Sequence, residues 1–194
     1  MLQHVAMEAG GIVKVLVAYA SKYGATKGIA EFIGEKLREK GLSADVQDVS
    51  KVRDVKAYDA FVIGSALYMF HWMKEARKFI SHNRSVLSSR PVWIFSSGPL
   101  GNDAKDKEGR DLREVSGPKE LEELRGEVSF GEHKVFFGAL DGSRLTGTMG
   151  FFYRMARKSE EARAEMPEGD FRNWREIESW AASIAEALAQ YTSG

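Results

Sequence analysis

The chain has no cysteine in its 194 residues. This excludes disulfides, thiolate catalysis, iron–sulfur clusters and cysteine-ligated zinc, and it fits an intracellular protein, so we expect a cytoplasmic location. No apolar run approaches the ~20 residues that a membrane-spanning helix needs. An excess of charge of either sign is also missing, because 28 basic residues balance 28 acidic ones. This balance argues against a general nucleic-acid-binding protein. The four histidines are scattered without metal-ligand spacing, so we expect no metal site.

The first eleven residues lack the basic start and the apolar stretch of a secretory signal. We expect residues 1–11 to be a short N-terminal lead. The hydrophobic content of 43% and charged content of 29% are ordinary for a globular protein. Residues 12–192 are long enough to bury one sizeable core and show no internal linker. We therefore expect a single domain over residues 12–192.

The chain is organised around residues 12–26, which join an apolar run, IVKVLVAY, to a short polar turn, ASKYGAT. The run is typical of a strand buried on both faces, and a helical pattern follows the turn. The unpaired N–H groups and the dipole at the start of a helix attract anions. Because Ser21 and Thr26 can add hydroxyl donors, this stretch predicts a phosphate site. The alternative is an ordinary strand–helix turn in which Thr26 is only the N-cap.

Strand patterns alternate with helical patterns along the rest of the chain, which implies crossover connections and a parallel sheet. We expect an α/β fold with three layers, a doubly wound five-stranded parallel sheet in the order 2-1-3-4-5 and an extra segment after the fifth strand. Ligands of such sheets bind beyond the carboxyl ends of the strands. The turns at residues 20–26, 64–72 and 96–102 would meet there. They offer phosphate donors, an aromatic and apolar surface, and glycine amides for a pyrimidine edge, which together suit flavin mononucleotide (FMN). The expected strands are 12–19, 44–49, 59–65, 91–97 and 134–140, and the expected helices cover 26–40, 72–80, 118–125 and the residues after 173.

Residues 141–170 form the least generic stretch, an expected insertion or lid segment that mixes apolar and basic residues. Three interpretations stay open. A surface helix could pack Phe151 and Met155 on the domain. The segment could instead be a lid or membrane-surface element that admits a hydrophobic substrate or quinone. Finally, Phe151 and Phe152 could form a dimer contact.

Four stretches of residues 13–189 resemble the flavodoxin-like superfamily, most closely the branch of the quinone-linked (menaquinone-dependent) protoporphyrinogen IX dehydrogenases. They are VLVAYASKYGATKGIAEFI, YDAFVIGSALYMFHW, SSGPLG, and the closing strand GAL with its long following segment. The resemblance implies that FMN binds with its phosphate in the first loop and its ring system between the second and third loops.

The resemblance also implies the residues that hold FMN. His71 is in addition a candidate proton donor to the flavin or the substrate, because imidazole titrates near neutral pH; the alternative is a solvent-exposed histidine. The remaining chemistry belongs to the flavin itself. The implied cofactor-binding residues are Ser21, Lys22, Tyr23, Gly24, Ala25 and Thr26 in the first loop, Ser65, Ala66, Leu67, Tyr68 and His71 in the second, and Ser96, Ser97, Gly98, Pro99 and Gly101 in the third.

Two departures from the family pattern are informative. Tyr23 stands before the loop glycine, where a hydroxyl residue is usual, so phosphate binding should rely on Ser21, Thr26 and backbone N–H groups. Residues 65–73 contain no glycine, so a turn with positive φ there would be strained. We therefore expect weak semiquinone stabilisation and a preference for two-electron chemistry.

The leading hypothesis is an FMN-dependent oxidoreductase that resembles protoporphyrinogen IX dehydrogenase and passes electrons to a quinone. The alternative is a non-enzymatic flavodoxin-type electron-transfer protein. Expected partners are a redox partner or quinone and a small-molecule substrate, with peripheral contact at the inner face of the membrane and homodimer formation as further alternatives. A flavin-free signalling module is a third hypothesis, but Tyr19, Ala20 and Ser21 do not supply the acids that receiver domains carry at the end of the first strand.

Overall fold

The computed structural model describes residues 11–101, 103, 105, 108–160 and 167–192, with the side chains of Met149, Phe152, Ala156 and Thr192 left out. The expected N-terminal lead lies, apart from Gly11, outside the described residues.

Five parallel strands form the central sheet, in the spatial order β2-β1-β3-β5-β6. A two-residue strand, β4 (His71–Trp72), pairs antiparallel with the end of β3. Counted without β4, the order is 2-1-3-4-5, so the predicted topology is confirmed. The parallel strands are β1 (Lys14–Ala20), β2 (Ser43–Asp48), β3 (Ala60–Tyr68), β5 (Val92–Ser97) and β6 (His133–Phe136).

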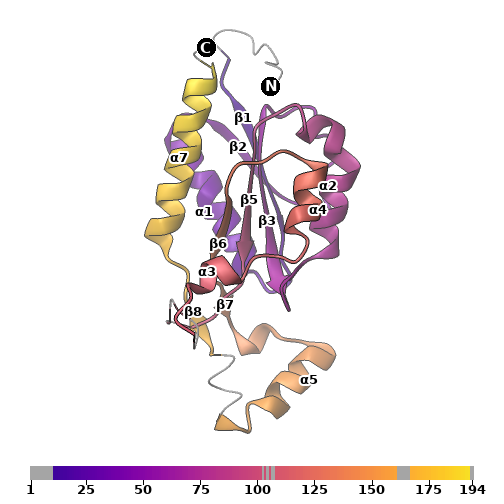
Figure 1. Cartoon of the computed structure of the whole chain (residues 1–194), viewed down its shortest axis with the longest axis vertical. Coiled ribbons are helices and arrows are strands. Elements are labelled where there is room, and N and C mark those ends of the chain that lie inside the picture. Colours follow the sequence, from indigo (N-terminus) through magenta and orange to yellow (C-terminus); the bar gives the residue numbers. More distant parts are fainter. Residues whose placement is uncertain (1–10, 102, 104, 106–107, 161–166, 193–194) are drawn as a thin grey trace.

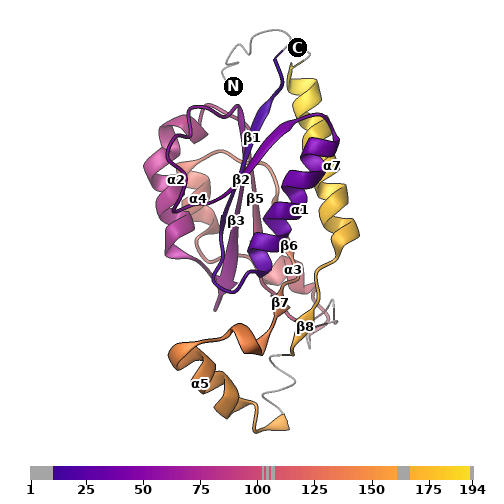
Figure 2. The ribbon, with the colours of Figure 1, turned by 180° about the vertical axis from the view of Figure 1, so that it is seen from behind.

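Helices cover both faces of the sheet (Figures 1 and 2), as α1 (Ala25–Glu39) and α7 (Trp174–Thr192) lie on one face and α2 (Lys74–Leu87) and α4 (Leu121–Glu127) on the other. Alternate residues of β1 enter the two cores: Val15 and Val17 pack with α1 and α7, and Leu16 and Ala18 pack with α2 and α4. Burial on both faces explains why the strands read as continuous apolar runs. The predicted three-layer arrangement is confirmed.

The predicted strand over residues 134–140 is wrong in its second half. The sheet strand β6 ends at Phe136, and a separate strand, β7 (Ala139–Leu140), pairs antiparallel with β8 (Gly169–Asp170). Gly138 marks the break, because its N–H donates to the carbonyl of Pro99 at 2.8 Å and its carbonyl accepts from the N–H of Phe171 at 3.1 Å. These bonds draw the chain out of the sheet.

Two other boundaries differ from the prediction. The stretch at residues 66–72, expected to be a turn, is a tight hairpin in which β3 continues to Tyr68 and β4 returns from His71. The helix expected from Pro118 begins later, at Leu121, whose N–H donates to the Pro118 carbonyl at 3.1 Å. A short helix, α3 (Leu112–Val115), precedes it.

The segment after β7 contains the 3₁₀ helix η1 (Gly142–Arg144) and the helix α5 (Gly147–Ala156). Figure 1 shows α5 beyond the carboxyl ends of the strands, apart from the helix layers. The interpretation that packs Phe151 and Met155 on the domain is wrong, because these side chains are 56% and 49% exposed. Tyr153 of α5 is buried, and its hydroxyl donates to Glu168 at 2.9 Å. No helix among the described residues is long and apolar enough to cross a membrane.

Candidate functional site

A cleft of about 430 Å³ lies where β1, β3 and β5 end. Parallel strands place their carboxyl ends at one edge of the sheet, and the reversal of strand order between β1 and β3 opens a crevice there. The turns that follow the three strands each contribute to its lining. The lining residues are Ser21, Tyr23, Ala25, Thr26, Ala66, Leu67, Tyr68, Met69, Ser97, Gly98, Leu100, Gly138, Ala139, Leu140 and Leu145.

The first turn presents the start of α1 to this cleft. Gly24 is the N-cap residue with φ 96°, and none of the described side chains caps the helix. The interpretation of Thr26 as the N-cap is therefore wrong. Ser21 fixes the turn, because its Oγ accepts the N–H of Gly24 at 3.1 Å. The first N–H groups of α1 have no partners within the helix, so they are available to an anion.

Thr26 carries the clearest sign of a missing partner. It is fully buried, yet its Oγ1 has no hydrogen-bond partner among the described residues. A buried hydroxyl without a partner costs about 1–3 kcal/mol. The hydroxyl of Tyr23 is also buried without a described partner, and its ring meets that of Tyr68 edge-on at 6.4 Å. A bound oxyanion would satisfy Thr26 together with the helix N–H groups.

The second wall is the hairpin tip, where Met69 and Phe70 have φ of 51° and 64°. A turn with positive φ thus forms here without glycine, and the strain expected of such a turn applies to it. Each such residue costs on the order of 1 kcal/mol, so the surroundings must hold the tip in place. The N–H of Lys119 donates to the carbonyl of Phe70 at 2.8 Å, and the carboxylate of Glu120 accepts the N–H of Trp72 at 3.3 Å.

His71 begins the return strand of the hairpin and lies outside the cleft lining. Its Nδ1 donates to the carboxylate of Glu120 at 2.7 Å. Burial raises the pKa of Glu120, but the hydrogen bonds from His71 and backbone N–H groups and the charge of Arg77 outweigh it, and the net pKa is lowered. His71 and Glu120 thus anchor the hairpin. The role of His71 in proton transfer stays a prediction.

The third wall contains Ser97, Gly98 and Leu100. The N–H of Gly98 donates to the carbonyl of Phe136 at 3.1 Å, so the expectation that this amide faces a ligand is wrong. Ser96 points into the protein instead of the cleft. Its Oγ accepts the indole N–H of Trp72 at 2.7 Å and lies 2.8 Å from Nε2 of His133.

The family model described as a flavodoxin domain matches residues 16–165. The chain belongs to this family. It is 28% identical over 85 residues to the protoporphyrinogen IX dehydrogenase [quinone] of Escherichia coli (strain K12), a match that covers 43% of the chain. The match spans about half of that relative, 47% of its length.

Solved structures show the same fold at low identity. A flavodoxin from the domain Archaea is 16% identical with a TM-score of 0.54, and the match covers 91% of the chain and 99% of that protein. A flavodoxin from Pseudomonas aeruginosa is 20% identical with a TM-score of 0.54 and the same coverage. The flavodiiron core of Synechocystis sp. PCC6803 has a TM-score of 0.60 at 14% identity, over 93% of the chain and 37% of that protein.

The flavodoxin domain gathers most of the predicted residues at its cleft, with informative exceptions. Lys22 lies with its ammonium 5.3 Å from the centre of the Tyr23 ring. Ser65 closes the base of the hairpin, because its Oγ accepts the N–H of Met73 at 3.0 Å. Pro99 lines a smaller cavity of about 190 Å³. The predicted residues in the cleft lining are Ser21, Tyr23, Ala25, Thr26, Ala66, Leu67, Tyr68, Ser97 and Gly98, and those outside it are Lys22, Gly24, Ser65, His71, Ser96, Pro99 and Gly101.

A fourth segment of the flavodoxin domain, residues 138–145, also lines the cleft and was not predicted. It follows β6, which is parallel to β5 and ends at the same edge. The rule that ligands bind at the carboxyl ends of the strands could have identified it.

A second cavity of about 580 Å³ adjoins the cleft at the start of α1. It shares Tyr23, Ala25, Ala139 and Leu140 with the cleft. Its charged lining residues are the cations Lys27, Arg144 and Arg172 and the carboxylates Glu31, Asp141, Glu168 and Asp170. Arg172 is occupied by a bidentate pair with Asp170, at 2.7 Å and 2.6 Å. The apolar cleft and this charged cavity meet at the turn before α1 and at β7.

Proposed function

We propose that this flavodoxin domain binds FMN without a covalent bond in the 430 Å³ cleft. The observation that carries the proposal is Thr26, whose buried Oγ1 lacks a partner at the uncapped start of α1. The phosphate of FMN would accept from this hydroxyl and from the first N–H groups of α1. The hydroxyl and N–H donors at the start of α1 therefore fit the phosphate of FMN.

The rest of the cleft suits a flat aromatic ring system. Leu67, Leu100, Leu140 and Leu145 give it an apolar lining, and Tyr68 adds an aromatic face. Burial, with a smaller contribution from Tyr23, raises the pKa of Tyr68 to about 12, so the phenol keeps its proton near neutral pH. When bound, FMN supplies the electron-transfer chemistry, and the protein orients it and excludes water.

We further propose that the domain acts as an oxidoreductase on a protoporphyrinogen-like substrate with a quinone as electron acceptor. The support is the similarity of 85 residues to the E. coli dehydrogenase, together with an apolar cleft that would expose one edge of the flavin. A second candidate function is that of an electron carrier. The exposed hairpin tip favours it, because Met69 at the edge of the cleft and its neighbour Phe70 form a small apolar patch of the kind that transient redox partners bury.

Colour tests the cofactor. The purified protein is expected to be yellow, to release FMN on denaturation and to regain its colour when refolded with FMN. As a control, Thr26→Val should lose colour more readily than Thr26→Ser, which keeps the hydroxyl. A colourless protein that takes up no added FMN would overturn the proposal.

Turnover separates the two functions. FMN-loaded protein is mixed with protoporphyrinogen and a detergent-solubilised menaquinone analogue, and porphyrin fluorescence is followed. The enzyme is expected to produce porphyrin at a rate that depends on the quinone. An electron carrier would give no such rate and would instead support cytochrome reduction by a separate flavin reductase.

A further inference from the structure

We propose that Arg144 is a second side-chain ligand of the cofactor phosphate, supplied by the segment that follows β7. This inference rests on the proposed binding of FMN. It adds a cation to a phosphate site that otherwise consists of a hydroxyl and backbone N–H groups. It also links the stretch between β7 and α5 to occupancy of the cleft.

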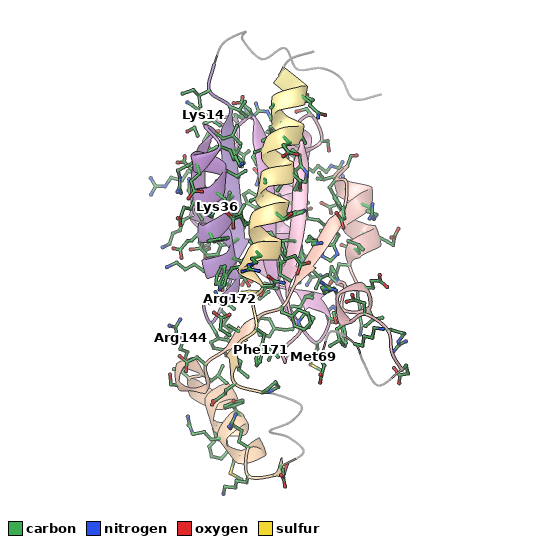
Figure 3. The ribbon with its side chains drawn as sticks, turned by 90° about the vertical axis from the view of Figure 1, so that its left-hand side faces the viewer. Lys14, Lys36, Met69, Arg144, Phe171 and Arg172 are labelled. Carbon is green, nitrogen blue, oxygen red and sulfur yellow. The ribbon has the colours of Figure 1, made fainter. Side chains whose placement is uncertain are left out.

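Arg144 lies beside the turn at the start of α1. Its Nη1 lies 3.0 Å from the point where a Cβ on Gly24 would stand, so the guanidinium touches the turn at the start of α1. Figure 3 shows Arg144 at the end of the molecule where α1 begins. Because Gly24 has no side chain, the guanidinium can approach the backbone of the turn. Arg144 lines the charged cavity together with Tyr23 and Gly24.

The Arg144 guanidinium is oriented by Asp141. Its Nε lies 3.2 Å from Oδ2 of Asp141, three residues earlier. Asp141 is itself held by the N–H and hydroxyl of Ser143, at 3.0 Å and 2.6 Å. These hydrogen bonds and the charge of Arg144 lower the pKa of Asp141. A stable carboxylate thus holds the Nε side and leaves Nη1 directed at the turn.

The charge of the FMN phosphate exceeds what the start of α1 can balance. The phosphate monoester of FMN carries close to two negative charges at pH 7, whereas a helix N-terminus offers only about half a positive charge. Each neighbouring cation has a carboxylate partner: Lys27 pairs with Glu31 at 3.5 Å, and Arg172 is bound to Asp170. Arg144 differs because its pair with Asp141 engages Nε and leaves Nη1 beside the turn. A guanidinium beside the turn would supply the missing charge.

Arg144 is connected to the cleft through the residue that follows it. Leu145, the next residue, is buried and lines the cleft. The phosphate would therefore hold Arg144 while the ring system contacts its neighbour. Recognition of the phosphate by Arg144 would distinguish FMN from riboflavin, which has the same ring system and no phosphate.

The test compares the two flavins in the full-length apoprotein, by quenching of flavin fluorescence. Loss of one charge-assisted contact should raise the Kd for FMN in Arg144→Gln by about ten-fold or more. The Kd for riboflavin should stay unchanged, which also reports that the variant is folded. Arg144→Lys should fall between the wild type and Arg144→Gln, because it keeps the charge and loses the planar fork.

Arg154→Gln is the matched control, since Arg154 is an exposed arginine on α5. It should bind FMN like the wild type. Equal FMN affinities of the wild type and Arg144→Gln, or an equal loss of FMN and riboflavin affinity, would overturn the inference while FMN binding itself stands. A wild-type protein that binds neither flavin would overturn the proposed function and this inference together.

Discussion

Met69 and Phe70 are consecutive residues without the flexibility of glycine, and both have positive φ, 51° and 64°. Two-residue hairpin turns with two positive φ values strongly prefer Asn-Gly or Asp-Gly. The hairpin at the mouth of the cleft therefore stores backbone strain, and the bonds from residues 119 and 120 to the hairpin hold it.

This strain predicts that Met69→Asn stabilises the protein. The Met69 side chain is 87% exposed, so its loss removes little apolar burial, and asparagine tolerates the left-handed region. We expect a gain of about 0.5–1 kcal/mol and a rise in Tm of roughly 1–4 °C. Differential scanning fluorimetry of the apoprotein measures it. Met155→Asn, at a half-exposed helical position, is the matched control and should give no rise; an unchanged or lower Tm for Met69→Asn would show that the tip is not strained.

His133 predicts a loss of stability in mild acid. Burial, aided by Arg125, lowers its pKa to about 4, and its Nε2 accepts the hydroxyl proton of Ser96. The unfolded chain takes up this proton near pH 6.5 and the folded chain only near pH 4. Stability is therefore full above pH 6.5 and falls as the pH drops toward 4, by on the order of 3 kcal/mol for this group.

Urea unfolding between pH 4 and 8 measures this effect in the wild type and in His133→Gln. The variant should be less stable at pH 8 but should lose less stability on acidification. His82→Gln, at an exposed position on α2, is the control and should follow the wild-type curve. Parallel curves for the wild type and His133→Gln would contradict the assignment.

The sheet order could be predicted because each parallel strand is buried on both faces and reads as an apolar run. Burial on both faces also explains why the prediction that Ser96 faces the ligand is wrong. A serine at the end of a strand suggests a ligand, but the side chains of successive residues point to opposite faces. Ser96 turns inward to Trp72, and Ser97 reaches the cleft.

The hairpin and the break after β6 could not be predicted for a different reason. Both depend on long-range contacts that override local preference. Turn statistics argue against positive φ at Met69 and Phe70, and the bonds that hold them come from residues about 50 positions away. Gly138 likewise leaves the sheet because of hydrogen bonds to Pro99 and Phe171, which no periodic pattern reveals.

The exposed face of α5 predicts a binding role rather than a packing role. Phe151→Ser with Met155→Ser should change the free energy of unfolding by less than about 0.5 kcal/mol for each side chain, as expected at exposed positions. Tyr153→Ser is the comparison and should destabilise strongly, because Tyr153 is buried and bonded to Glu168. Chemical denaturation measures both variants. A large loss of stability in the double variant would show that Phe151 and Met155 pack in the core.

The same double variant tests peripheral membrane contact. Exposed apolar residues lie on α5 and at the hairpin tip, and Figure 3 shows Met69 at the end of the molecule that carries α5. We propose that this end touches the membrane surface. Sedimentation with vesicles of equal parts zwitterionic and anionic lipid should be weaker for the double variant than for the wild type. A fall in mass by light scattering with unchanged sedimentation would instead indicate a dimer contact.

Thr26 predicts opposite changes in stability and affinity. Thr26→Val keeps the shape and removes a buried hydroxyl that has no described partner, so the apoprotein should gain about 1 kcal/mol or more. The same change removes a donor to the phosphate, so the Kd for FMN should rise by about ten-fold. Tyr23→Phe should weaken FMN binding less, because the phosphate is assigned to the Thr26 hydroxyl and the first N–H groups of α1, whereas Tyr23 lies between the two cavities. If Tyr23→Phe had the larger effect, the phosphate would have been assigned to the wrong side of the turn.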